Sequence, residues 1–116
     1  MTSGSAPAAE PTVVTLCGSL RFRDKLERLE AELSLAGHVV LAPAALDPSV
    51  ALGADARARL GEVHLRKVAM AEEVLVVNVG GYVGDSTGRE IEHARALGIP
   101  VRFLEPPADP GVAPTA

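Results

Sequence analysis

Residues 74–90 read VLVVNVGGYVGDSTGRE, an apolar run followed by a glycine-rich turn and the beginning of a helical pattern. A short apolar run bounded by glycine is typical of a buried strand. Glycines in the turn let the backbone approach a ligand closely, and the N–H groups of a first helical turn can bind an anion. The stretch therefore predicts a strand, a turn and a helix around an anion site, with one acid, Glu90, beside it.

The alternation of strand and helix continues on both sides of this stretch. We expect strands at 13–17, 38–41, 74–79 and 101–104, and helices at 22–36, 54–71 and 87–97. Apolar residues of the first helix recur at spacings of four and three, which places on one face Phe22, Leu26, Leu29, Leu33 and Ala36. Gly37 and Gly98 are typical helix ends. We predict an α/β fold, a three-layer sandwich with a small parallel sheet, flavodoxin- or Rossmann-like, with strand order 2-1-3-4.

Composition narrows the classes of function. The net charge of −4 and the three aromatic residues argue against binding a nucleic acid polymer. No apolar run approaches the roughly 20 residues of a membrane span, and the N-terminus has no secretion signal. The single cysteine excludes a disulfide within the chain and fits a reducing compartment. We expect a cytoplasmic protein with no membrane partner.

Proline and small residues dominate both ends of the chain. We expect a disordered N-terminal tail at 1–11, a nucleotide-binding α/β domain at 12–104 and a proline-rich C-terminal tail at 105–116. A small, apolar-rich domain of this kind is expected to form a homodimer through its helices.

Two loops are expected to share one crevice. With strand order 2-1-3-4 the order reverses between the first and third strands, and ligands bind beyond the carboxyl ends of strands at such a point. The loops that leave these strands are 18–21 and 80–90. The candidate binding residues in them are Gly18, Ser19, Leu20, Arg21, Gly81, Tyr82, Gly84, Asp85, Ser86, Thr87 and Gly88.

Structural roles compete with these assignments. Ser19 could cap a helix, with Arg21 a solvated residue of its first turn. The spacing of Thr87 and Glu90 fits a capping box, in which the glutamate bonds back to the backbone. Tyr82 could simply cover the loop, and Asp85 could be an ordinary turn aspartate.

No metal site or cofactor is expected. Glu90 and His93 have a spacing used in carboxylate metal sites, but such sites need ligands from other helices. Cys17 is interpreted as a buried structural cysteine with no histidine placed beside it. His64 and Lys67 share a face of the second helix, near the crevice or on a solvated rim.

Two motifs resemble the nucleoside 2-deoxyribosyltransferase-like superfamily, which includes the 2-deoxynucleoside 5-phosphate N-hydrolases. The residues are CGSLR at 17–21 and STGREIEHA at 86–94, the latter followed by LGIPV at 97–101. The resemblance implies an N-glycosidase that cleaves or transfers the base–sugar bond of a nucleoside or nucleotide. By motif position Glu90 matches the family's nucleophile. Positions that contact phosphate in the N-hydrolases are matched by Ser19, Arg21, Gly84 and Ser86.

One departure from the family opens alternatives. The family carries an aspartate before its third strand that helps to protonate the leaving base, and residues 62–67 here contain none. His64 is the expected substitute as general acid. The alternatives are a lysine-decarboxylase-like nucleoside monophosphate phosphoribohydrolase, whose Pro-Gly-Gly-x-Gly-Thr turn is lacking, and a non-catalytic nucleotide-sensing module.

Overall fold

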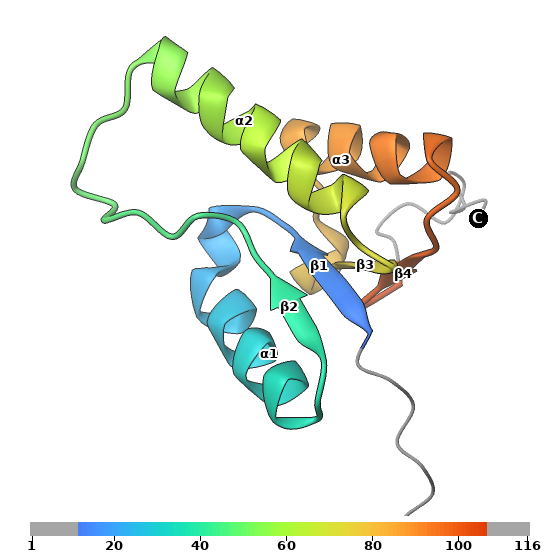
Figure 1. Cartoon of the computed structure of the whole chain (residues 1–116). Coiled ribbons are helices and arrows are strands. Elements are labelled where there is room, and N and C mark those ends of the chain that lie inside the picture. The colour runs from blue at the N-terminus through green and yellow to red at the C-terminus, as the bar shows by residue number, and fades with distance from the viewer. Residues whose placement is uncertain (1–11, 107–116) are drawn as a thin grey trace, which may run out of the picture.

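A four-stranded, all-parallel sheet forms the centre of the computed structural model, which describes residues 12–106 (Figure 1). In sheet order the strands are β2 (Val39–Leu41), β1 (Val13–Cys17), β3 (Glu73–Val76) and β4 (Val101–Phe103). The helices are α1 (Arg23–Leu35), α2 (Ala54–Ala69) and α3 (Asp85–Ala96). Two short 3₁₀ helices, η1 (Leu20–Phe22) and η2 (Val79–Gly81), follow β1 and β3. The α/β class and the strand order 2-1-3-4 predicted from sequence are confirmed.

The helices form a layer on each face of the sheet. Figure 1 shows α2 and α3 beside each other on one face and α1 on the other. Successive side chains of a strand point to opposite faces, so each central strand contributes to two cores. The core under α1 contains Val14, Leu16, Leu26, Leu29, Leu75 and Val77. The core under α2 and α3 contains Cys17, Val68, Ala71, Val74, Val76, Ile91 and Ala94.

The two central strands end together at one edge of the sheet. Cys17 pairs with Val76, and the Val77 N–H donates to the Cys17 carbonyl at 2.7 Å. The chain leaving β1 then passes very close to β3, since a Cβ at Gly18 would lie 2.9 Å from the Val77 carbonyl oxygen. Glycine permits this approach, so the loops after β1 and β3 begin as neighbours.

Several predicted boundaries shift for local reasons. β3 ends at Val76 instead of residue 79, because the chain turns away through Gly80 and Gly81, whose φ angles are 67° and 86°. The Asn78 side chain is fully buried and exchanges two hydrogen bonds with the backbone of Glu105. Ala36, predicted to share the apolar face of the first helix, is the exposed C-cap of α1, which ends at Leu35.

The predicted helix ends at Gly37 and Gly98 are confirmed by positive φ angles of 101° and 75°. The predicted N-terminal tail at 1–11 and residues 107–116 of the predicted C-terminal tail lie outside the described residues. Within residues 12–106, none of the helices is both long and apolar enough to cross a membrane.

Candidate active site

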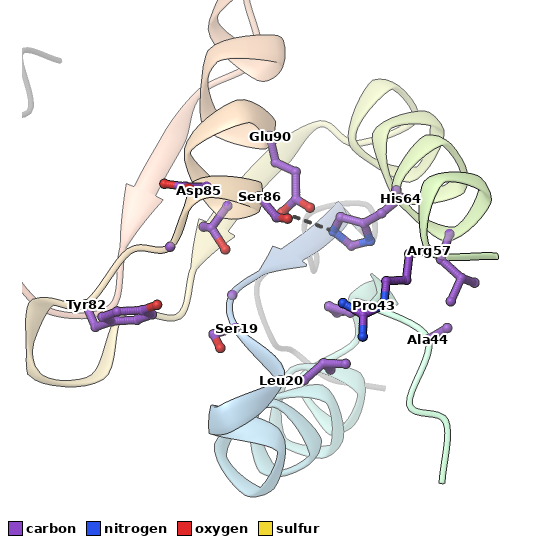
Figure 2. Close-up of a pocket in the computed structure, with 15 residues that line it drawn as sticks. Ser19, Leu20, Pro43, Ala44, Arg57, His64, Tyr82, Asp85, Ser86 and Glu90 are labelled. Atoms are coloured by element: carbon purple, nitrogen blue, oxygen red, sulfur yellow. Dashed lines mark ion pairs between the residues drawn. The ribbon is translucent and has the colours of Figure 1, made fainter. Parts of the chain in front are cut away.

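A cavity of about 440 Å³ opens at the carboxyl ends of β1 and β3, beside α2 and the beginning of α3 (Figure 2). This is the position predicted from the strand order. Its walls come from the loops after β1 and β2, one side of α2, and the turn and first helical turns of α3. The lining residues are Gly18, Ser19, Leu20, Pro43, Ala44, Arg57, Leu60, Gly61, His64, Tyr82, Gly84, Asp85, Ser86, Thr87 and Glu90.

The start of α3 brings Glu90 into this cavity. The helix begins at Asp85, with Gly84 as its N-cap and no side-chain capping bond. Thr87 is therefore a buried residue of the first turn, not a cap, and the capping-box interpretation is wrong because the helix starts three residues earlier than that box requires. Glu90 lies one turn further on, and its side chain, 14% exposed, points into the cavity (Figure 2).

The loop after β1 combines a structural role with a place in the cavity wall. Ser19 caps η1, since its hydroxyl accepts a hydrogen bond from the Arg21 N–H at 3.1 Å, which confirms the capping interpretation. Ser19 also lines the cavity. The Arg21 guanidinium instead lies over the Tyr82 ring, 3.9 Å from its centre, and is not part of the cavity lining.

Of the remaining predicted binding residues, most line the cavity and two do not. The residues that line the cavity are Gly18, Leu20, Tyr82, Gly84, Asp85, Ser86 and Thr87. Gly81 is buried within η2, where its positive φ serves the turn, and Gly88 lies within α3; neither contributes to the lining. The structure thus brings most of the two predicted loops together around the cavity. Gly81 and Gly88 contribute to the course of the backbone and not to the lining.

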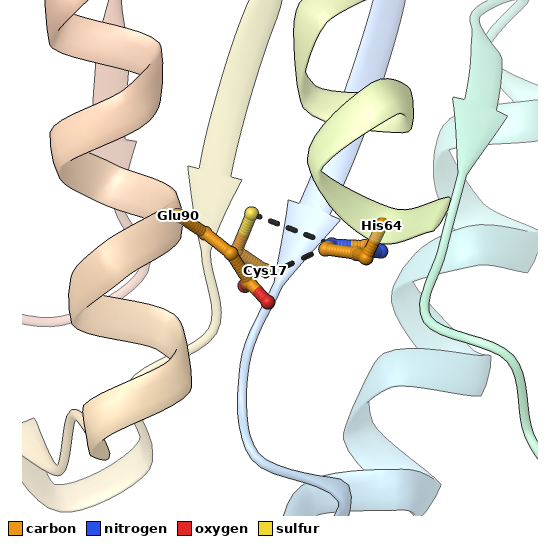
Figure 3. Close-up of side chains that lie close together, drawn as sticks. All are labelled: Cys17, His64 and Glu90. Atoms are coloured by element: carbon orange, nitrogen blue, oxygen red, sulfur yellow. Dashed lines mark hydrogen bonds and ion pairs between the residues drawn. The ribbon is translucent and has the colours of Figure 1, made fainter. Parts of the chain in front are cut away.

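Three ionisable side chains lie close together beside the cavity, and two of them, His64 and Glu90, line it (Figure 3). The Nε2 atom of His64 lies 3.6 Å from the Cys17 sulfur and 3.8 Å from a Glu90 carboxylate oxygen. The expectation that no histidine lies beside Cys17 is therefore wrong: the packing of α2 against the sheet places His64 directly over the end of β1. His93, paired with Glu90 by spacing, is not part of this cluster.

Burial shifts the protonation of all three groups. Burial raises the pKa of Glu90 to about 7, partly opposed by a hydrogen bond with Cys17 and by the charge of Arg89. Burial, together with the nearby Lys67 charge, lowers the pKa of His64 to about 4. Burial and the Glu90 charge raise the pKa of the Cys17 thiol well above its usual range. At neutral pH the imidazole is thus uncharged, the thiol keeps its proton, and Glu90 is divided between its two forms.

Five residues of the cavity wall are not predicted from the sequence. The missed lining residues are Pro43, Ala44, Arg57, Leu60 and Gly61. They belong to the loop after β2 and to α2, whose sequences carry no phosphate-binding or catalytic motif. A weak signal was available for Pro43 and Ala44, since they follow a strand whose carboxyl end faces the same edge of the sheet. Arg57 had no such signal.

Known proteins resemble this chain in structure more than in sequence. No protein-family model and no curated protein matches the sequence. A solved 2-deoxyribosyltransferase from Bacillus psychrosaccharolyticus is 17% identical, with a TM-score of 0.61 over 84% of this chain and 74% of that one. A conserved protein from Enterococcus faecalis V583 is 20% identical, with a TM-score of 0.56 over 80% of this chain and 62% of that one.

Because both sequence identities are low, the similarity to these two proteins is a similarity of backbone fold. It agrees with the parallel sheet of order β2-β1-β3-β4 and with the resemblance carried by residues 17–21 and 86–101. The chain therefore has a nucleoside 2-deoxyribosyltransferase-like fold.

Proposed function

We propose that this protein is an N-glycosidase that cleaves or transfers the base–sugar bond of nucleosides or nucleoside 5′-monophosphates, with Glu90 as the nucleophile. The observation that carries the proposal is the position of Glu90. Its carboxylate is largely buried, points into the cavity and lies beside His64 of α2, in a cavity that the loops leaving β1 and β3 also line. A carboxylate there can approach a sugar carbon held in the cavity from one side.

The chemistry follows from what a carboxylate can do to a glycosidic bond. As the bond between the sugar carbon and the base nitrogen breaks, positive charge develops on the sugar, and the ionised Glu90 stabilises it and then bonds to that carbon. The bonding electrons leave with the base, which takes a proton from water. Attack by water, or by a second base, releases the sugar and restores the Glu90 carboxylate.

His64 fits a positioning role better than the general-acid role expected from sequence. A general acid must carry a proton that it can give up near the working pH. Burial holds the pKa of His64 at about 4, so the neutral ring has no extra proton to supply at pH 7. Its Nε2 atom lies 3.8 Å from the Glu90 carboxylate, where the ring packs against one side of that group.

The charges around the cavity bear on the choice of substrate. Among the described residues that line it, Arg57 is the one side chain with a permanent positive charge, while Asp85 and Glu90 are acidic. The first turn of α3 adds backbone N–H groups that Gly84 does not cap. An arginine and a helix N-terminus together suit a phosphate. This supports nucleoside monophosphates as substrates, with Arg57 in the phosphate-binding role.

The test is base release from a panel of nucleosides and nucleoside monophosphates, measured by chromatography. Replacing Glu90 with Gln keeps the shape of the side chain and removes the nucleophile, so we expect turnover to fall by about 10³-fold or more. Nucleotide affinity, measured by calorimetry, should change only a few-fold. The matched control is Glu92→Gln, an exposed position on the same helix, which should keep full activity.

Two results would contradict this proposal. Unchanged turnover in Glu90→Gln would remove the nucleophile assignment. Saturable nucleotide binding to the unmodified protein, with no base released from any substrate, would instead favour the nucleotide-sensing module.

A further inference from the structure

We propose that Cys17, His64 and Glu90 form a binding site for a Zn²⁺ ion, with a fourth coordination position open to the cavity. The three side chains come from different elements: the end of β1, the middle of α2 and the second turn of α3 (Figure 3). Their ligand atoms all lie within 4.8 Å of one another. From the sequence no metal site is expected, because Glu90 pairs by spacing only with His93 on its own helix and no further ligand is evident.

The distances suit a tetrahedral ion. With Zn–S near 2.3 Å and Zn–N and Zn–O near 2.0–2.2 Å, tetrahedral angles place a sulfur about 3.6 Å from a nitrogen and a nitrogen about 3.4 Å from an oxygen. The observed separations are 3.6 Å from Cys17 Sγ to His64 Nε2 and 3.8 Å from His64 Nε2 to Glu90 Oε1. A small rotation of the Glu90 side chain would bring its oxygen to the required distance.

The ligand types select zinc over the common hard cations. Thiolate and imidazole suit Zn²⁺, whereas Mg²⁺ and Ca²⁺ prefer sites made only of oxygen atoms. Binding deprotonates the Cys17 thiol: the sulfur bonds to the metal and its proton passes to the buffer. A thiolate and a carboxylate then balance the charge of the divalent ion, so the buried site carries no net charge.

The burial of the three side chains leaves an ion one route to the site, from the cavity. Cys17 is fully buried and His64 is 6% exposed, while the Glu90 side chain is 14% exposed and lines the cavity. Three protein ligands with an open fourth position resemble catalytic zinc sites more than closed structural ones. The buried Nδ1 atom of His64 makes no well-formed hydrogen bond in residues 12–106, although the Leu16 backbone lies close enough to the ring to raise its pKa. The outer acceptor that usually orients a metal-bound imidazole is thus only weakly engaged. We therefore expect weaker binding than at structural zinc sites.

A bound ion would compete with the reaction proposed above, and this consequence rests on the proposed function. The same Glu90 carboxylate cannot hold the metal and attack a sugar. Zinc should therefore inhibit base release, and a chelator should restore it.

The experiment is a titration of the chelator-treated, tag-free full chain with Co²⁺, followed by displacement with Zn²⁺. A cobalt–thiolate bond produces a charge-transfer absorption, and Cys17 is the one cysteine of the chain, so this signal reports that residue alone. We expect saturation at one ion per chain and loss of the signal on adding Zn²⁺. Cys17→Ser should abolish the absorption, and His64→Gln and Glu90→Gln should each weaken binding at least tenfold.

Two controls separate the site from other ligands. His93→Gln and Glu92→Gln change neighbouring residues of α3 outside the cluster and should leave cobalt binding unchanged. Zn²⁺ should raise the melting temperature of the unmodified protein and of these two controls, and should not raise that of Cys17→Ser or of Cys17→Ala, a second variant in case the serine impairs folding.

The results distinguish this inference from the proposed function. Absence of the charge-transfer absorption in the unmodified protein would overturn the zinc site, even if base release is measured. Cobalt binding that depends on all three residues, in a protein that releases no base after chelation, would uphold the zinc site and remove the glycosidase.

Discussion

The Arg21 guanidinium carbon lies 3.9 Å from the centre of the Tyr82 ring. The Phe22 ring meets the same tyrosine edge-on, with ring centroids 6.0 Å apart. Arg21 and Phe22 belong to η1, after β1, whereas Tyr82 follows η2, after β3. The stacking therefore joins the two loops that form the cavity, with a cation–π attraction of about 0.5–1 kcal/mol at an exposed position. It also leaves Arg57, not Arg21, as the cation in the cavity wall.

The two arginines should affect substrates differently. Arg57→Gln removes the charge expected to bind phosphate, and because a charged hydrogen bond contributes about 1.5–3 kcal/mol, the KM for nucleoside monophosphates should rise about tenfold or more. The KM for the corresponding nucleosides should change less than twofold. Arg21→Gln, which acts through the position of Tyr82, should raise both KM values by similar factors. Equal effects of Arg57→Gln on both substrate classes would remove Arg57 from the phosphate-binding role.

The activity of the metal-free protein should depend on the ionisation of Glu90. Because the nucleophile must be a carboxylate and burial raises its pKa to about 7, kcat/KM should rise as the pH increases through about 7 and then level off. His64, with its pKa lowered to about 4, should add no inflection between pH 5.5 and 8.5. Rates measured in the presence of a chelator would check this. A profile that is flat across neutral pH is incompatible with the nucleophile assignment.

Glu90 should also make stability depend on pH. Its pKa rises from 4.5 to about 7 on folding, so the folded protein holds this proton more tightly than the unfolded chain does. The resulting stabilisation is complete below pH 4.5 and is lost as the pH rises through about 7. The side chain of the Glu90→Gln variant does not titrate. The free energy of unfolding of the variant minus that of the wild type should therefore increase by about 2 kcal/mol between pH 5 and pH 8.

Urea denaturation of both proteins at the two pH values measures this difference. The contribution of His64 is common to both and largely cancels. If the difference in unfolding free energy between the two proteins stays constant with pH, burial does not destabilise the ionised form of Glu90.

Gly18 and Gly88 should respond in opposite ways to the same substitution. A methyl group at Gly18 would lie 2.9 Å from the Val77 carbonyl oxygen, so Gly18→Ala forces the two loops apart. We expect its free energy of unfolding to fall by about 1–3 kcal/mol. At Gly88, within α3, a methyl group meets nothing within 4 Å, so Gly88→Ala should raise stability by up to about 1 kcal/mol through helix propensity. Wild-type stability in Gly18→Ala, measured by urea denaturation, would contradict the close approach.

The sequence was sufficient to predict the sheet and most of the cavity lining. The apolar runs, the glycines after α1 and α3 and the helical spacing of the first helix act over a few residues, and they predicted the elements. The strand order came from the doubly wound arrangement that is common for alternating strands and helices. The carboxyl ends of neighbouring parallel strands meet at one edge. The convergence of Ser19 with the turn before α3 therefore followed from topology alone.

The rest of the site depended on tertiary packing. Successive residues of a helix are rotated by about 100° around its axis. Which side chains α2 presents to the sheet therefore depends on how the helix is rotated and where along the sheet it packs. The sequence of α2 does not specify these two quantities. This packing places His64 beside Cys17, 47 residues away along the chain, and brings Arg57 into the cavity wall. Because α3 begins at Asp85, Glu90 is not a capping residue and faces the cavity. The sequence alone predicted the edge of the sheet at which the cavity lies, and only the packing of the helices decided which further side chains line it.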